Sequence, residues 1–189
     1  MRIPVVKPGE LSDEQRALDG HVRQITGGFQ TPFTAMDDDG ALIGPFPVML
    51  RFPALARPLL EWFTTVSSDS VLGARVREVA ILTTGSRYGA AYELYSHSRI
   101  ALAIGLSDSV VAALVAGQRP SGLTPEEAVA HDVAACLHSG APLPGVLYRR
   151  AVDVFGEPGT AELVFLTAQY ASISMVLNAY DVPLPADAE

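Results

Sequence analysis

Apolar positions along the chain recur with the spacing of α-helices rather than of β-strands. Leu18, Val22 and Ile25 fall on one helical face. Ahead of them Ser12 is followed three residues later by Gln15, which is the pattern of a capping box at a helix start. No stretch alternates between apolar and polar positions as a strand would, and no internal repeat is visible. The sequence therefore predicts an all-α fold.

Start and stop signals divide the rest of the chain into further helices. A threonine cap, a proline and two glutamates at positions 124–127 mark a start, and glycines at 105, 117 and 140 mark ends. A Gly-Glu-Pro-Gly linker at 156–159 is expected to separate the last two helices. The helices expected after the first cover about residues 53–63, 72–84, 90–104, 107–117, 124–140, 144–155 and 160–179.

Residues 27–47 (GGFQTPFTAMDDDGALIGPFP) are rich in Gly, Pro and Asp and predict a long loop. Its phenylalanines, Phe29, Phe33 and Phe46, indicate that the loop packs on the body, and an ordered loop of this length is often functional, for example as a lid. We expect one domain over residues 1–189, with an N-terminal helix and loop in 1–47 and a helical core in 48–185.

Composition and charge limit the classes of partner that the protein is expected to bind. The chain is 49% hydrophobic and 18% charged, which is apolar for a monomer and suggests that another subunit covers part of its surface. Its net charge is −8, and its 13 basic residues are scattered among 21 acidic ones. That pattern offers no basic patch, so nucleic acid is not an expected partner.

No membrane partner is expected either. The longest uncharged run, 163–180, is interrupted by five polar residues and predicts a buried helix rather than a membrane span. The first ten residues lack the apolar core of a signal peptide, so we expect a cytoplasmic protein. The single cysteine, Cys136, excludes an intrachain disulfide and a cysteine-based metal cage.

Three residues are candidates for acid–base chemistry. Glu93 and His97 are four positions apart, so on a helix they share a face and can touch. A carboxylate beside an imidazole orients the ring and makes it a proton shuttle near neutral pH. Glu78 opens a preceding apolar run (REVAILTTG) and should face a core. On spacing alone, such a pair is more often a surface pair or a hydrogen-bonded core histidine.

No metal and no cofactor are predicted. His131 and His138 are seven residues apart and can share a helical face, but no third ligand has metal-like spacing, which favours a structural or subunit-contact role. The carboxylate and imidazole side chains of Glu78, Glu93 and His97 would also suit a metal ion, but their spacing in the sequence is not that of di-iron carboxylate bundles.

The segment REVAILTTGSRYGAAYELYSHSRIALAIGLSDSVVAALVAG resembles the signature region of carboxymuconolactone decarboxylase-like proteins. In these, an Arg-Glu pair opens one helix and a Tyr-Glu-x-x-x-His segment follows in the next. The flanks GALIGPFPVMLRFPALA and LNAYDVPLP agree as well, so the resemblance covers about residues 11–185. It implies an alkylhydroperoxidase D-like helical bundle and, together with the apolar composition, a homo-oligomer built on a trimer or its multiples.

The redox branch of that superfamily has a Cys-x-x-Cys pair ahead of the histidine. The resemblance places those cysteines at Ala90 and Glu93, the assisting acid at Glu78 and the histidine at His97. Thiol peroxidase chemistry needs a thiolate and a resolving thiol, and this chain has neither there. Cys136 lies in another expected helix, where a buried small apolar side chain is the simpler interpretation.

The resemblance thus implies a lyase that uses cofactor-free proton transfer on a small carboxylated or enolisable cyclic molecule. His97 would donate the proton, Glu93 would fix its tautomer and Glu78 would stabilise the imidazolium. Two alternatives stay open: an alkylhydroperoxidase-like antioxidant protein, and a non-catalytic small-molecule-binding or scaffold protein. Three further residues are candidates for binding the substrate: Tyr92, Arg77 and Arg87. The two arginines would bind an anionic substrate.

Overall fold

The computed structural model describes residues 1–29, 31–68 and 70–188. Its regular structure in these residues consists of α-helices and two short 3₁₀ helices, with one isolated bridge between Met36 and Leu42, so the predicted all-α class is confirmed. The α-helices are α1 (Asp13–Ile25), α2 (Phe46–Arg51), α3 (Pro53–Ser68), α4 (Ala74–Tyr88), α5 (Ala91–Ala103), α6 (Asp108–Val115), α7 (Pro125–Leu137) and α8 (Gly145–Ala179).

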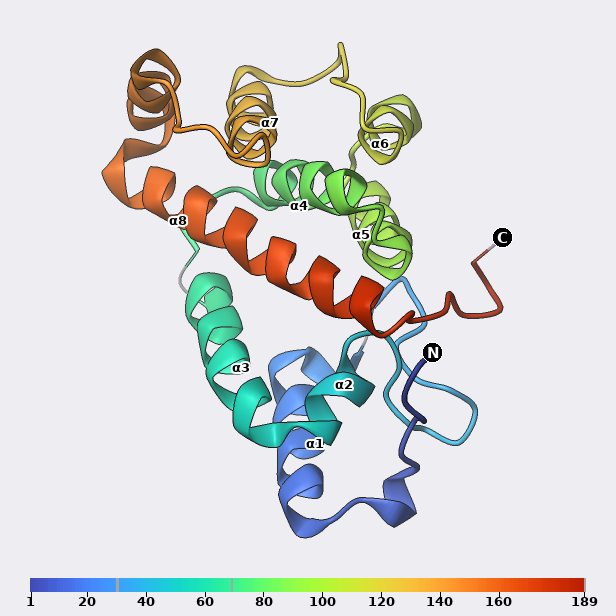
Figure 1. The fold of residues 1–189 in the computed structure, drawn as a ribbon. Helices are drawn as coiled ribbons and strands as arrows, with labels where there is room; N and C mark the ends of the chain where they lie inside the picture. Colours follow the sequence, from blue (N-terminus) through green and yellow to red (C-terminus); the bar gives the residue numbers. More distant parts are fainter. Residues whose placement is uncertain (30, 69, 189) are drawn as a thin grey trace.

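Helix α8 organises the molecule (Figure 1). Its second part crosses between α1–α3 on one side and α4–α7 on the other, and it contacts α3, α4, α5 and α7. Leu163, Leu166 and Leu177 are buried along it. Burial of each such side chain contributes about 1.5–3 kcal/mol, so α8 holds the two groups of helices together.

The composition of α8 allows a second interpretation. By length and hydropathy α8 could cross a membrane, but half of its most apolar window is buried inside the protein, and core helices meet the same criterion.

The capping box predicted at Ser12 and the helix start predicted at Thr124 are both present. The Ser12 hydroxyl accepts from the Gln15 backbone N–H at 3.3 Å, and the Gln15 side chain accepts from the Ser12 N–H at 2.9 Å. Thr124 and Glu127 form the same reciprocal pair at the start of α7. Each box satisfies two backbone donors that a helix start leaves free.

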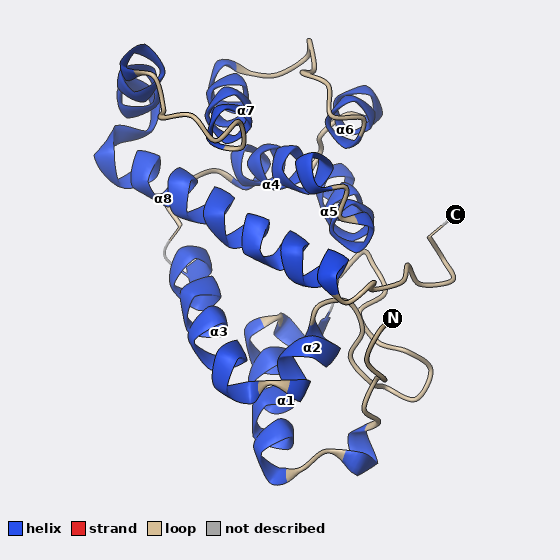
Figure 2. Cartoon of the chain, viewed as in Figure 1, coloured by secondary structure: helices blue, strands red, loops and turns tan. Residues whose placement is uncertain are grey.

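Two elements differ from the prediction. The expected linker at 156–159 is a kink inside α8: Gly156 alone leaves the helical conformation, with φ of 68°, and the helix resumes at once. Pro158 sits in the first turn after the kink, where its missing N–H costs nothing. In addition, the short helix α2 lies ahead of Pro53, where no helix was expected (Figure 2).

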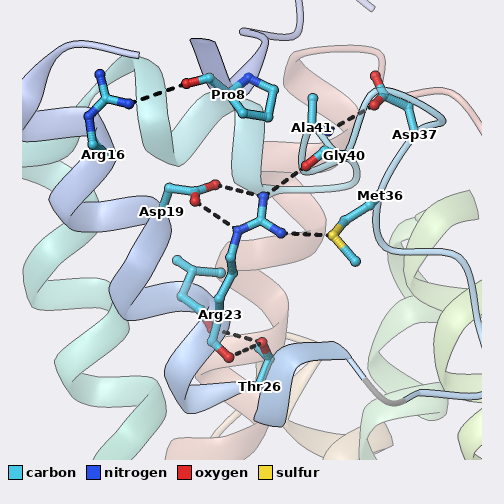
Figure 3. A network of polar contacts seen from close by, with 10 residues as sticks. Pro8, Arg16, Asp19, Arg23, Thr26, Met36, Asp37, Gly40 and Ala41 are labelled. Atoms are coloured by element: carbon cyan, nitrogen blue, oxygen red, sulfur yellow. Dashed lines mark hydrogen bonds and ion pairs between the residues drawn. The ribbon is translucent and has the colours of Figure 1, made fainter. Parts of the chain in front are cut away.

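The long loop ahead of α2 is anchored to α1 by Arg23 (Figure 3). The Arg23 guanidinium donates to the Asp19 carboxylate at 2.8 and 3.2 Å, to the Gly40 carbonyl at 2.8 Å and to the Met36 sulfur at 2.9 Å. Hydrogen bonds to a charged group are stronger than neutral ones. One half-buried arginine therefore fixes both sides of the turn at the loop's tip.

The loop is also tied to α5. The Tyr92 hydroxyl donates to the Thr34 carbonyl, and the Tyr95 hydroxyl accepts from the Thr34 N–H, each at 2.9 Å. Phe33 and Phe46 pack against the core as expected, whereas the side chain of Phe29 lies outside the described part of the chain. The loop is thus an ordered wall beside α5.

Candidate active site

The three predicted residues converge on the imidazole of His97. Glu78 reaches it from α4: its Oε2 lies 2.8 Å from Nδ1 of His97, within hydrogen-bonding distance. Glu93, one turn earlier on α5, has its Oε1 3.7 Å from Nε2. The ring therefore lies between two carboxylates, one on each nitrogen. Because a carboxylate only accepts, Nδ1 carries a proton, and Nε2 is the nitrogen left for chemistry.

All three groups are removed from water. Glu78 and Glu93 are 7% and 3% exposed, and the His97 side chain is 14% exposed. Oε1 of Glu93 is fully buried and has no hydrogen-bond partner among the residues that the structure describes. A buried polar atom without a partner costs free energy, and such atoms are uncommon unless something binds them.

Burial and neighbouring charges shift the protonation of this group. Burial lowers the pKa of His97, but the charge and hydrogen bond of Glu78, with the charge of Glu93, outweigh it and raise this pKa to about 8. Burial raises the pKa of Glu93 from 4.5 to about 7, against the opposing effect of His97. Near neutral pH the ring is therefore mainly charged, and Glu93 is close to the point where it gains or loses its proton.

A cavity of about 280 Å³ opens onto this group. Glu78, Glu93, His97 and Ser96 line it together with apolar and aromatic side chains of the loop, α2, α3 and α8. No arginine or lysine belongs to its lining among the described residues. The apolar part of the lining includes Ile25, Phe33, Phe46, Met49, Leu59, Leu60, Phe63, Ile100 and Ile173.

The candidate substrate-binding residues are placed differently from one another. The Tyr92 ring lines the cavity while its hydroxyl is bonded to the loop, and burial raises the pKa of this phenol far above its usual range. Arg77 and Arg87 are not in the lining. Arg77 donates to Ser67 at 3.4 Å and acts on the site only through its charge, which slightly opposes protonation of His97.

Tyr170 of α8 is a wall of the site that sequence reasoning missed. Its ring meets the His97 ring edge to face, with centroids 5.0 Å apart. It is buried and lines the cavity. The run 163–180 carries no spacing signal that singles out this tyrosine, because its position depends on α8 crossing α5.

The side chains of Glu78, Glu93 and His97 do not point toward one common position, as the ligands of a metal ion would. The two nitrogens of His97 face different carboxylates, and no group of three His, Cys, Asp or Glu side chains in the described ranges is placed to hold a metal ion. Cys136 is half-buried on α7, less enclosed than expected, and does not line the cavity.

Comparison with known proteins relates the chain to others through its fold. No protein-family model and no curated protein sequence matches it. A solved structure titled as an alkylhydroperoxidase AhpD core, an uncharacterized peroxidase-related protein from Ralstonia eutropha, is 14% identical; the match covers 99% of this chain and 93% of that one, with a TM-score of 0.77. A peroxidase-related protein from a Silicibacter species is 15% identical, with coverages of 99% and 92% and a TM-score of 0.77.

A third solved structure is a cysteine-to-alanine variant of the debrominase Bmp8 in complex with 2,3,4-tribromopyrrole. It is 16% identical, with coverages of 100% and 94% and a TM-score of 0.75. Identities this low show the fold alone. The chain therefore has the alkylhydroperoxidase D-like helical fold, as predicted.

Proposed function

We propose that the protein is a cofactor-free acid–base enzyme, a carboxymuconolactone decarboxylase-like lyase acting on a small, mostly apolar, enolisable ring. The observation that carries the proposal is the His97 imidazole, held between two buried carboxylates at the wall of an apolar cavity. A charged ring near neutral pH is the form that a general acid needs.

The carboxylates would have the reverse of the roles expected from the resemblance. Glu78, not Glu93, makes the close hydrogen bond to Nδ1 and so fixes the tautomer. Nε2 of His97 would then deliver its proton to the substrate carbon. Glu93 shares a helical face with His97, but its longer distance leaves it free to meet the substrate.

Glu93 would contact a polar atom of the substrate. Its Oε1 is buried without a partner, and near neutral pH the group is partly uncharged. In the uncharged form it can donate a hydrogen bond to a carbonyl or enolate oxygen. Such a contact strengthens as negative charge develops on that oxygen, which stabilises the transition state of an enolisation or decarboxylation.

The lining points to a substrate with little charge. Without an arginine or lysine in the cavity, a single carboxylate would find its counter-charge at His97. Burial among apolar side chains disfavours that carboxylate, and loss of CO2 relieves the cost. The cavity volume of about 280 Å³ is small for a ligand pocket, and the debrominase of the same fold holds a small ring, a bromopyrrole.

Neither alternative has comparable support. A thiol peroxidase would need cysteines at the cavity, where Ala90 and Glu93 occupy the positions assigned to them by the resemblance. A scaffold protein would have its core filled at this point, whereas the cavity reaches all three acid–base residues. A non-catalytic small-molecule-binding protein would also keep a cavity, and the turnover measurement below distinguishes it from an enzyme.

The test is proton exchange in D2O. Cyclic ketones and unsaturated lactones, with and without a carboxylate, would be incubated with the protein while NMR follows deuterium incorporation and loss of CO2. We expect His97→Gln to lower turnover about 10²- to 10⁴-fold, the usual contribution of a general acid. His21→Gln, at an exposed position of α1, is the matched control and should keep full activity. Equal rates for wild type and a folded His97→Gln variant would refute the proposal.

A further inference from the structure

A second cavity lies on the opposite side of α4 from His97. Its volume is about 450 Å³, and it is bounded by α4, α7 and the segment that follows α6. Glu78 and Arg87 are nine residues apart on α4, which corresponds to about two and a half turns at about 100° per residue and so to opposite faces of the helix. The two cavities therefore use opposite faces of one helix. The polar lining of the second cavity consists of Thr83, Ser86, Arg87, Gln118, Arg119, His131 and His138.

His138 offers one free ring nitrogen to this cavity. Its Nε2 lies 3.0 Å from the hydroxyl of Thr84, and that hydroxyl donates its own proton to the Ala80 carbonyl at 2.8 Å. The hydroxyl must therefore accept from Nε2–H. Nδ1 of His138 has no partner among the described residues, so the neutral ring presents a bare nitrogen there.

The ring of His131, two turns earlier on α7, also has one hydrogen-bonded nitrogen and one free nitrogen. Its Nδ1 lies 3.1 Å from the Asp132 carboxylate, which can only accept, so the proton sits on Nδ1. Nε2 of His131 has no partner in the described part of the chain. Each ring thus has one nitrogen committed as a donor and one free, and each becomes a donor on both sides when protonated.

The fixed charges around the two rings are mostly positive. Arg87 is exposed and makes no ion pair or hydrogen bond with any described residue. Asp132 is paired with Arg119 through two bonds of 2.7 and 3.1 Å, and Arg150 approaches the same carboxylate at 3.9 Å. No Asp or Glu belongs to the cavity lining given by the described residues, although the chain carries a net charge of −8.

From this cluster we infer that the second cavity binds a small organic oxyanion, a carboxylate or a phosphate or sulfate ester. Arg87 supplies the permanent charge, His131 and His138 become charged donors to the oxygens, and the side chains of Leu114 and Ala135 meet the organic part. The inference is independent of the proposed function, because it uses the other face of α4.

Binding of an oxyanion should take up protons. Burial and the charge of Arg87 lower the pKa of His138, so its ring is neutral in the empty cavity at neutral pH. An anion between the rings favours their charged forms. Affinity is therefore expected to rise as the pH falls, with Asp132, Arg119 and Arg150 keeping their charges throughout.

NMR of the imidazole nitrogens tests this directly, because the chain has four histidines. Sulfate and benzoate, whose charges stay constant over the range used, would be titrated at about pH 6 and about pH 8. We expect saturable shifts of His131 and His138 with both anions, no shift of His21, and no shift of His97 with sulfate, which does not suit the apolar first cavity. Binding should be about tenfold tighter at the lower pH. Calorimetry in two buffers should show proton uptake on binding.

Arg87→Gln should weaken binding about tenfold, as expected for loss of a charged hydrogen-bond donor. Arg51→Gln, which removes the same charge from an exposed position on α2, should leave it unchanged. His138→Gln should remove part of the proton uptake. Absence of saturable shifts at the lower pH, or equal affinities for wild type and Arg87→Gln, would overturn the inference.

Discussion

The raised pKa values of His97 and Glu93 make the stability of the protein depend on pH. The pKa of the folded ring, about 8, lies above the ordinary 6.5. The stabilisation is therefore fully present below about pH 6.5 and is lost as the pH rises through about 8. Glu93 acts in the same direction, because its pKa is also raised, from 4.5 to about 7. Both groups favour the folded state in their protonated forms.

We expect the free energy of unfolding to fall by about 2 kcal/mol between about pH 6 and about pH 8.5 through His97 alone. Urea unfolding at the two pH values measures it. The double variant Glu78→Gln with His97→Gln removes this contribution without leaving the Glu78 carboxylate unpaired, and it keeps Glu93, so the His97 part of the pH dependence should be absent from it. A wild type that gains stability with rising pH relative to the double variant would contradict the assignment.

Spacing alone predicted part of this site. The four-residue interval placed Glu93 beside His97, whereas the approach of Glu78 depends on how α4 packs on α5 and followed only from the resemblance. The helical period could also have excluded Arg87 from the site, since it lies on the face of α4 opposite to Glu78. Tyr170 comes from a helix much later in the chain, and no local pattern predicts its contact with His97.

The helices were predicted correctly where an N-cap residue or the helical spacing of apolar residues defines them. The prediction failed where glycine and proline are compatible with both a linker and a kinked helix. Ser12 and Thr124 act as caps as expected. Gly156 and Pro158 are typical of a linker, yet they produce a kink, because proline suits the first turn of a resumed helix. The loop was expected to pack on the body, and over residues 31–45 it is tied down by Arg23 and Tyr92; which contacts hold it could not be predicted, because they involve distant positions.

Gly44 tests how closely this loop packs on α5. It has φ of +71°, and a Cβ at this position would overlap Cε1 of the Tyr92 ring. We expect Gly44→Ala to destabilise the protein by about 2–4 kcal/mol, the sum of left-handed strain and overpacking. Gly40→Ala is the matched control: its φ is +78° but no atom lies within 4 Å, so only about 1–2 kcal/mol of strain should appear. Thermal or urea unfolding measures both losses. If Gly44→Ala and Gly40→Ala lowered the free energy of unfolding equally, the loop would not pack as closely on Tyr92 as the structure indicates.

At the scale of the whole molecule, several large apolar side chains are exposed on α3 and α8. The apolar face of α6 is covered within the chain, since Val110 and Leu114 are buried against neighbouring helices. Leu55 on α3 is instead 74% exposed, and Phe165 and Met175 on α8 are 58% and 53% exposed. Phe165 meets Trp62 of α3 edge to face, with centroids 6.4 Å apart, so α3 and α8 adjoin there. Such side chains favour a partner surface.

We propose that α3 and the second part of α8 form the contact between copies in a homo-oligomer, a trimer or a multiple of one. Burying Phe165 in such a contact contributes about 1.5–3 kcal/mol, and a charge there would have to be buried unpaired. Phe165→Arg should therefore shift the mass measured by light scattering toward the 20.0 kDa of one chain. Val146→Arg places the same charge at a 70% exposed position before the α8 kink and should leave the assembly intact. A wild type that remains at the single-chain mass throughout the micromolar range would remove the proposal.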